Sequence, residues 1–292
     1  MKALILGSTG QVAHALMASA GGLEAIALGR PGIDLADAAS IEAAIAAHAP
    51  DLVINAAAYT AVDKAESEAD AAFAINASGA GAAAAAARAA GAAFLHLSTD
   101  FVFDGTKPGA YLEDDPVSPL GVYGASKQAG EAAVRAAHPE AVIVRLSWVY
   151  AAHGGNFAKT MLRLAGDRDE IGVVADQLGR PTAAEDIAPA LWTLGKGLVA
   201  QRTSPHNLYH LGPQGEATWA DFAAAIMEAS KAAGGPFAHI RRITTADYPT
   251  PAARPVLSTR LGRMSGRVSS PRTRALADLR WRITPISPRR WR

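Results

Sequence analysis

The chain of 292 residues contains no cysteine. This absence excludes disulfide bonds and thiol catalysis, and because it suits a reducing compartment we expect a cytoplasmic protein. The sequence also has no run of about 18 apolar residues, the length that a membrane-spanning helix needs. No basic stretch with a cleavage site precedes the first apolar segment, so we expect neither a signal peptide nor a membrane partner.

Neither sign of charge dominates the composition, but charge is distributed unevenly along the chain. The formal net charge is +1 and 50% of the residues are hydrophobic, which is typical of a globular protein with one large or two modest domains. Residues 261–292 hold nine arginines and a single acid, Asp278, so this tail carries +8 and the rest of the chain −7. Two interpretations of the tail stay open, an altered reading frame or a basic segment for an anionic partner. The tail has no nucleic-acid reader motif, so we expect no nucleic-acid partner.

Short apolar segments alternate with helical patterns through the first 150 residues. The apolar segments are continuous runs, which is typical of parallel strands that are buried on both faces. The expected strands are 2–7, 24–29, 51–57, 93–99 and 141–150. The expected helices are 11–20, 40–49 with Ser40 as its cap, 66–90 and 124–137. This βαβα order predicts an α/β fold with a Rossmann-type doubly wound parallel sheet.

The alternation of expected strands and helices becomes less regular after residue 150, and the segments that connect them are rich in glycine and proline. The expected helices there are 156–166, 183–195 and 218–233, and the expected strands are 171–176 and 207–212. We therefore predict a Rossmann domain over 1–150, with 171–195 returning to it. A smaller, interleaved C-terminal lobe follows over 151–260, and an atypical basic tail over 261–292.

A glycine turn directly follows the first expected strand, in the spacing Gly7-x-x-Gly10-x-x-Ala13. Glycines there permit a tight turn and let the backbone approach a pyrophosphate, which binds N–H groups at the start of the next helix. Such turns are common and weak signals alone. The position of this one, after an N-terminal strand inside a βαβ unit, makes dinucleotide binding the favoured interpretation.

The end of the second strand indicates which cofactor is bound. No acid stands there to bond a ribose 2′-hydroxyl; Arg30 occupies the place instead and can pair with a 2′-phosphate, which favours NADP. A solvated loop arginine is the alternative. Asp34 is better placed to contact the adenine. Small residues in N-A-A-A-Y, 55–59, would let a cofactor lie against the sheet.

A tyrosine and a lysine in Y-G-A-S-K suggest the chemistry. Tyr123 and Lys127 are one helical turn apart and share a face. We expect the nearby ammonium to lower the pKa of the phenol toward the working range, so that Tyr123 can donate a proton. Thr99 ends the fourth strand in S-T-D, at the edge where such sheets bind ligands. Together these groups could polarise a carbonyl while a nicotinamide supplies hydride.

These features resemble the extended short-chain dehydrogenase/reductases, and more narrowly the dTDP-4-dehydrorhamnose reductase family. The stretches that carry the resemblance run in family order through about 255 residues. They are G-S-T-G-Q-V (7–12), N-A-A-A-Y-T-A-V-D-K-A-E (55–66), S-T-D-F-V-F-D-G (98–105), P-V-S-P-L-G-V-Y-G-A-S-K-Q-A-G-E (116–131), R-L-S-W-V-Y (145–150), N-F-A-K-T-M-L-R-L-A (156–165), D-Q-L-G-R-P-T (176–182) and Y-P-T-P-A-A-R-P (248–255).

The resemblance implies a 4-keto reduction of a dTDP-sugar by NADPH, with NADH as an alternative cofactor. It implies Thr99 and Tyr123 as catalytic residues that Lys127 assists, and a C-terminal lobe that holds the nucleotide sugar. For the cofactor it implies Gly10, Gln11, Val12, Asp34, Ala57, Ala58, Tyr59 and Thr60. With the residues argued above, the expected cofactor-binding set is Gly7, Thr9, Gly10, Gln11, Val12, Arg30, Asp34, Leu35, Ala57, Ala58, Tyr59, Thr60, Tyr123 and Lys127. The implied substrate-binding residues are Thr99, Asp100, Tyr123, Trp148 and Asn156, with Lys159 beside them.

The chain departs from the family pattern at several places. Phe101 stands where family members usually carry tyrosine. Some members bridge a dimer through Mg²⁺ with acids at three positions; here the first is Ala15, Glu185 keeps the second, and the third falls in the unmatched tail. We therefore expect no metal, and either a monomer or a homodimer. Two alternative functions stay open, reduction of another nucleotide sugar and a non-catalytic NAD(P)-binding regulatory subunit. Retention of the Thr99, Tyr123 and Lys127 set argues against the second.

Overall fold

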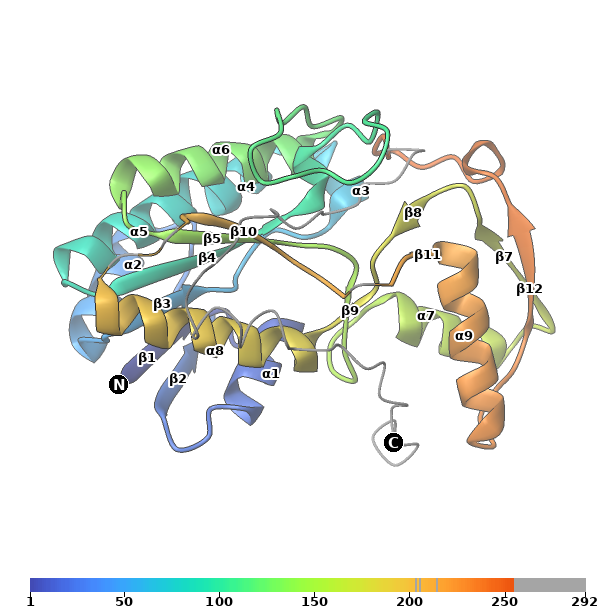
Figure 1. Cartoon of the computed structure of the whole chain (residues 1–292), viewed down its shortest axis with the longest axis horizontal. Coiled ribbons are helices and arrows are strands. Elements are labelled where there is room, and N and C mark those ends of the chain that lie inside the picture. Colours follow the sequence, from blue (N-terminus) through green and yellow to red (C-terminus); the bar gives the residue numbers. More distant parts are fainter. Residues whose placement is uncertain (203, 205, 214, 255–292) are drawn as a thin grey trace.

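The computed structural model describes residues 1–202, 204, 206–213 and 215–254. Its centre is a parallel sheet of six strands in the order β10-β5-β4-β3-β1-β2 (Figure 1). These strands are β1 (Lys2–Leu6), β2 (Glu24–Leu28), β3 (Leu52–Asn55), β4 (Ala93–Thr99), β5 (Val142–Leu146) and β10 (Leu208–Leu211). The strand order reverses between β1 and β3, and ligands bind at such a switch point in open α/β sheets. The predicted Rossmann-type sheet is confirmed.

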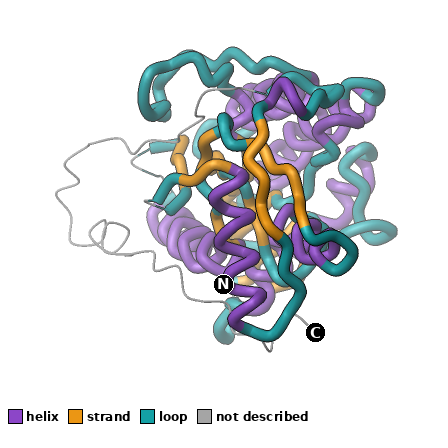
Figure 2. The backbone as a smooth tube through the Cα atoms, turned by 90° about the vertical axis from the view of Figure 1, so that its right-hand side faces the viewer, coloured by secondary structure: helices purple, strands orange, loops and turns teal. Residues whose placement is uncertain are grey.

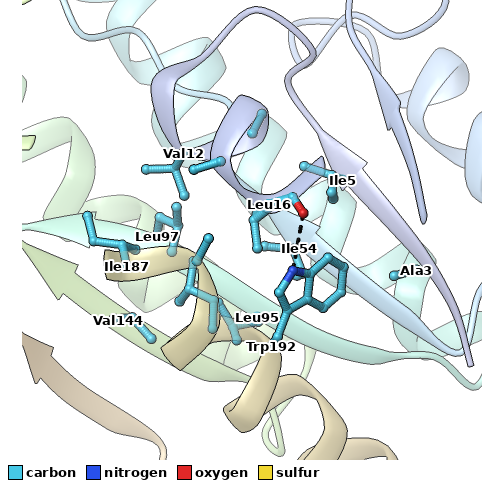
Figure 3. Packing of buried hydrophobic residues seen from close by; sticks show 14 of the residues in the cluster. Ala3, Ile5, Val12, Leu16, Ile54, Leu95, Leu97, Val144, Ile187 and Trp192 are labelled. Carbon is cyan, nitrogen blue, oxygen red and sulfur yellow. Dashed lines mark hydrogen bonds between the residues drawn. The ribbon is translucent and has the colours of Figure 1, made fainter. Parts of the chain in front are cut away.

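Helices cover both faces of the sheet. On one face, α1 (Gln11–Ala18) packs against α8 (Ala184–Gln201), and Trp192 Nε1 donates to the carbonyl oxygen of Leu16 at 3.2 Å (Figure 3). The other face is covered by α2 (Ala38–His48), α5 (Ala80–Ala89) and α6 (Val122–Ala137). Strands such as β3 are fully buried, because apolar side chains point from them to both faces.

Two helix predictions are wrong in detail. The second helix begins at Ala38 and is capped by Asp37, whose side chain accepts from the Ala39 N–H, so Ser40 is not the cap. The single helix expected over 66–90 is divided into α4 (Ala69–Phe73), a π-helical turn η1 (Ala74–Gly79) and α5, and a separate short helix, α3 (Val62–Ala65), precedes them. Within η1, Asn76 bonds the backbone of Tyr59 and the hydroxyl of Ser126, which holds this turn against α6.

A smaller lobe lies beside the carboxyl edge of the sheet (Figure 1). Its parallel strands β7 (Glu170–Val174) and β12 (His239–Ile243) pack with α7 (Phe157–Ala165) and α9 (Trp219–Ala232) around a separate apolar cluster. Figure 2 faces this lobe, with paired strands beside a helix at the front. Two further sheets consist of two short strands each: β6 (Val149–Tyr150) pairs with β9 (Thr182–Ala183), and β8 (Leu178–Gly179) pairs with β11 (Ala217–Thr218).

The chain passes between the lobes more than once. After β7 in the small lobe, α8 and β10 return to the large sheet, and β11, α9 and β12 leave it again. The residue boundaries given above for the domains stay predictions, and the basic tail lies outside the described residues. Within the part of the chain that the structure describes, no helix combines the length and apolar character that crossing a bilayer requires.

Candidate active site

The turn between β1 and α1 has the geometry of a phosphate cradle. Gly7 adopts φ +102°, and a Cβ added there would meet the Ala57 backbone at 3.1 Å, so glycine is required where β1 and β3 meet. Gly10 caps α1 without any side-chain hydrogen bond, which leaves the first N–H groups of this helix for a ligand. These features fit a dinucleotide at the switch point of the sheet.

The other candidate cofactor residues surround this turn at different depths. Val12 and Leu35 are buried in the core clusters, so their backbone is what they can offer a ligand. Arg30 is 77% exposed at the end of β2, with its Nη1 3.9 Å from the Asp34 carboxylate. Thr9 and Thr60 are exposed, and the remaining candidates of the turn and of the β3 end, Gln11, Ala57, Ala58 and Tyr59, are partly exposed.

Tyr123 and Thr99 meet at the carboxyl edge of the sheet. Thr99 ends β4, Tyr123 lies in the first turn of α6, and their hydroxyls are hydrogen-bonded. Thr99 Oγ1 also donates to Asp100 Oδ1 at 3.1 Å, and the second oxygen of this buried carboxylate accepts from Ser147 at 2.7 Å. Asp100, expected to bind substrate, thus lies beneath Thr99 and orients its hydroxyl.

The pKa of Tyr123 is raised to about 12: burial raises it most, the Thr99 hydroxyl lowers it, and the Asp100 carboxylate adds a smaller increase. The expectation that Lys127 lowers this pKa is wrong in this structure. The Lys127 ammonium points elsewhere: Nζ donates to the Leu97 carbonyl at 2.7 Å and lies 3.3 Å from His96 Nε2. Tyr123 is therefore a protonated phenol at neutral pH, the form that a proton donor needs.

Lys127 is an unusual lysine because it is only 2% exposed. Burial lowers its pKa to about 8, an effect that the Glu131 carboxylate on the same helix opposes. A lysine desolvated in this way beside a tyrosine is typical of a functional site rather than of a solvated helix face.

Two candidate residues from different lobes touch each other. Asn156 Nδ2 donates to Gln11 Oε1 at 3.0 Å and to the Ala151 carbonyl at 2.7 Å. Its Oδ1 accepts from the Lys159 N–H and so caps α7. Lys159, in the first turn of α7, donates from Nζ to the Ala152 carbonyl at 3.3 Å, so it contacts the loop that precedes this helix.

Trp148 lies where the chain leaves β5 for the small lobe. It adopts φ +45°, a strained value for a bulky residue and one that is found at functional sites. Its ring stacks on Trp219 at 3.5 Å, and a Cβ added to Gly179 would come within 2.3 Å of it. Nearby, Phe101 contacts the Tyr123 ring edge-on at 5.6 Å and lines a small pocket beside it.

Sequence reasoning missed the polar residues that support this site from below. Asn55, His96, Glu131 and Arg145 are buried in the sheet or against it. Glu131 forms a bidentate ion pair with Arg145 at 2.8 and 2.7 Å, and Ser98 donates to it at 2.7 Å. The available signal was a basic residue in the middle of each of two largely apolar strands, His96 in 93–99 and Arg145 in 141–150.

Among the described residues, no three histidine or acidic side chains gather as a metal site would require. Ala15 and Glu185, two positions of the family's metal bridge, lie on α1 and α8.

The comparisons with known proteins agree with this geometry. The sequence model of the family described as the RmlD substrate binding domain matches residues 1–275. The chain belongs to this family. It is 46% identical over 260 residues to the dTDP-4-dehydrorhamnose reductase of Sinorhizobium fredii, covering 88% of each chain. It is 40% identical over 288 residues to the enzyme of that name from Aggregatibacter actinomycetemcomitans, covering 95% of this chain and 97% of the relative.

Among solved structures, the fold is similar to dTDP-4-dehydrorhamnose reductase from Bacillus anthracis in complex with NADP. The TM-score is 0.82 at 34% identity, and the match covers 90% of this chain and 91% of that one. The predicted membership of the dTDP-4-dehydrorhamnose reductase family is confirmed.

Proposed function

We propose that the chain reduces the 4-keto group of dTDP-4-dehydro-L-rhamnose to dTDP-L-rhamnose, with NADPH as the reductant. The observation that carries this proposal is the Tyr123 phenol, which is hydrogen-bonded to Thr99 at the carboxyl end of β4. The glycine turn follows β1 at the same edge of this parallel sheet. The identity of the sugar and of the nucleotide is inferred from relatives named dTDP-4-dehydrorhamnose reductase, whose alignments cover 88% or more of this chain.

The bound dinucleotide supplies the hydride. Tyr123 donates its phenolic proton to the carbonyl oxygen, and because an alkoxide is a stronger base than a phenolate, the transfer is favourable even at a phenol pKa of about 12. Thr99 holds the phenol and is itself held by Asp100. Lys127 assists from its buried position one helical turn after Tyr123, where Nζ donates to the Leu97 carbonyl. Trp148 and Asn156 contact the nucleotide sugar from the small lobe.

The residues around the turn support NADPH as cofactor. Arg30 is exposed at the end of β2, where its guanidinium can pair with a 2′-phosphate, and the Bacillus anthracis relative was solved with NADP. NADH remains the alternative cofactor. The proposal includes no Mg²⁺, because Ala15 stands where the metal-bridged members carry an acid. The cytoplasmic location and the choice between monomer and homodimer stay predictions.

The test is NADPH consumption with dTDP-4-dehydro-L-rhamnose generated in situ. We expect turnover by the wild type and a loss of about 10²- to 10⁴-fold in Tyr123→Phe. The matched control is Tyr209→Phe, which removes a tyrosine hydroxyl from β10 at the far edge of the sheet. Wild-type chain that binds NADPH and does not consume it with this sugar would contradict the proposal and favour another nucleotide sugar or a regulatory role.

A further inference from the structure

Trp148 is held by its backbone at the point where the chain enters the small lobe. Its φ of +45° is a value that a bulky residue keeps only where the surrounding structure fixes it. The Thr182 N–H donates to the Trp148 carbonyl at 3.0 Å, and β6 pairs with β9 directly beyond this bond, with Val149 opposite Thr182. The strained backbone of Trp148 is therefore fixed by the segment D-Q-L-G-R-P-T, residues 176–182.

Both faces of the Trp148 indole are covered. Trp219 lies parallel to one face, with the ring centroids 3.5 Å apart and the ring planes 8° apart. A Cβ added to Gly179 would lie 2.3, 2.5 and 2.7 Å from three adjacent indole atoms, Cε2, Cζ2 and Nε1, and such distances place it over a ring face. Because Trp219 occupies one face, Gly179 lies over the other, and the indole can shift toward neither.

Trp219 is held in turn by a buried glutamine. Its Nε1 donates to Gln177 Oε1 at 3.2 Å, and Gln177 is only 8% exposed. The ring of Phe157 packs on Trp219 as well, with the ring centroids 4.5 Å apart. An indole that is bonded through its N–H and packed on its ring keeps one plane, and this is the plane on which Trp148 stacks.

The orientation of the Gln177 amide is set by a threonine and an acid. Thr245 donates its hydroxyl proton to Asp176 Oδ1 at 2.7 Å, and its backbone N–H donates to the same carboxylate at 2.9 Å. Since the hydroxyl proton is used there, the Thr245 oxygen accepts from Gln177 Nε2, 3.1 Å away. The amide oxygen is then the end that faces the Trp219 N–H, which can only donate.

Four residues of the segment 176–182 converge on Trp148 in this way. Gly179 and Thr182 touch it directly, whereas Asp176 and Gln177 act on it through Trp219. Gln177 and Trp219 are 42 residues apart in the chain, so two separate parts of the small lobe fix one ring at the lobe's entrance.

We infer that Gln177 and Trp219 are positioning residues for Trp148: the bonded Trp219 ring fixes the plane in which the small lobe presents the Trp148 indole to the sugar nucleotide. This inference deepens the proposed reductase function, on which its kinetic test rests. Its spectroscopic test does not depend on that function.

The spectroscopic test is ¹H–¹⁵N NMR of the indole N–H groups in the full chain, which has five tryptophans. The ring current of a stacked neighbour shifts a proton over its face upfield, so we expect an upfield Trp148 signal, assigned by its loss in Trp148→Phe. Trp219→Leu should move this signal downfield. Phe222→Leu removes a ring of the same cluster that contacts Tyr150 and Phe157, and should leave the signal in place. A Trp148 signal that is unchanged in Trp219→Leu would overturn the inference.

The kinetic test is a double-mutant cycle that measures KM for the sugar nucleotide. Trp219→Leu and Gln177→Met should each raise this KM about 2- to 10-fold, the worth of an aromatic pair or of a hydrogen bond, and leave KM for NADPH unchanged. Trp219→Phe keeps a ring for Trp148 to stack on and should raise it less than Trp219→Leu does. In a Trp148→Ala background, Trp219→Leu should have no further effect.

Two kinetic outcomes would contradict the inference. If Trp219→Leu raises KM for the sugar nucleotide as much in the Trp148→Ala background as in the wild type, Trp219 does not act through Trp148. If Trp219→Leu and Gln177→Met raise both KM values alike, the two residues have only a structural role. An inactive wild type would contradict the proposed function instead, and the NMR test would still decide whether Trp219 positions Trp148.

Discussion

The amide of Asn156 donates to the amide oxygen of Gln11 at 3.0 Å, which joins the start of α1 to the start of α7. Gln11 lies in the glycine turn of the large lobe, and Asn156 caps the first helix of the small lobe. This hydrogen bond therefore joins the helix expected to bind the cofactor to the helix expected to bind the sugar nucleotide.

Asn156→Ser tests this link between the lobes. Serine keeps the helix cap and removes the amide that reaches Gln11. The loss of a hydrogen bond of about 0.5–1.5 kcal/mol corresponds to about a 2- to 10-fold rise in KM for NADPH and for the sugar nucleotide. Steady-state kinetics, with NADPH and the sugar nucleotide varied in turn, measure both KM values. Thr160→Ala, which removes a side-chain bond on the same helix, is the control; equal effects from both changes would count against the link.

Gly179→Ala should displace Trp148. The new methyl would lie 2.3 Å from the indole, whose other neighbour, Trp219, is stacked at 3.5 Å and leaves no room for retreat. Overpacking of this kind costs about 1–3 kcal/mol. We expect kcat/KM for the sugar nucleotide to fall about tenfold while NADPH binding, measured by fluorescence titration, is unchanged. Gly197→Ala on α8, where an added Cβ meets nothing, is the matched control, and a similar loss there would defeat the explanation.

The ion pair between Asp63 and Arg254 makes stability depend on pH. Hydrogen bonds from Arg254 hold the pKa of Asp63 below its ordinary value. A depressed folded-state pKa stabilises the fold above the unfolded value of about 3.9, and this contribution is lost as pH falls through the folded pKa. The Asp63 side chain is 43% exposed, so the contribution is about 1 kcal/mol or less.

Asp63→Asn should therefore lower Tm by a few degrees or less at pH 7, and the difference from the wild type should shrink near pH 3. Thermal unfolding at both pH values measures it. Asp70→Asn, which changes an exposed acid on the neighbouring helix, should have no comparable effect. A difference that persists unchanged at pH 3 would show that the ion pair is not its cause.

Glu131→Gln should destabilise the fold severely. It leaves the Arg145 guanidinium, 3% exposed, without its charge partner inside the sheet, and breaking a buried pair in this way costs about 3–5 kcal/mol. Urea unfolding measures the loss. Arg135→Gln removes the outer, exposed partner of Glu131 at 3.7 Å and should cost about 1 kcal/mol or less. Comparable losses in the two variants would be inconsistent with this explanation.

The large lobe could be predicted from sequence because its strands are continuous apolar runs. β1, β2, β4 and β10 lie within one or two residues of their expected ranges. Burial on both faces leaves an unambiguous pattern in β1 and β4, whereas β2 and β10, at the two edges of the sheet, are only partly buried. β12 was missed: H-I-R-R-I has three exposed residues, and its partner β7 lies about 70 residues earlier in the chain. The π-helical turn at η1 was missed because Asn76 is held by distant backbone, which local periodicity does not record.

In the candidate site too, features with a local sequence pattern could be predicted, and features that depend on contacts between distant residues could not. Thr99, Tyr123 and Lys127 carry a spacing that can be recognised, and the structure brings Thr99 and Tyr123 into contact. The direction of the Tyr123 pKa could not be inferred, because it depends on desolvation and on where the Lys127 amine points. His96 and Asn55 were missed because His96 meets Asn55 of β3 and Lys127 of α6 only in the folded chain, and no motif encodes those contacts.

The small lobe is assembled from two stretches of chain that are separated by α8 and β10, and residues 252–254 then come back to Asp63 in the large lobe. No single recombination breakpoint can therefore exchange the small lobe between relatives, and no single proteolytic cut between the lobes can release it. New substrate preferences in such a chain have to arise by substitution within the lobe, since transplantation would need several coordinated breakpoints.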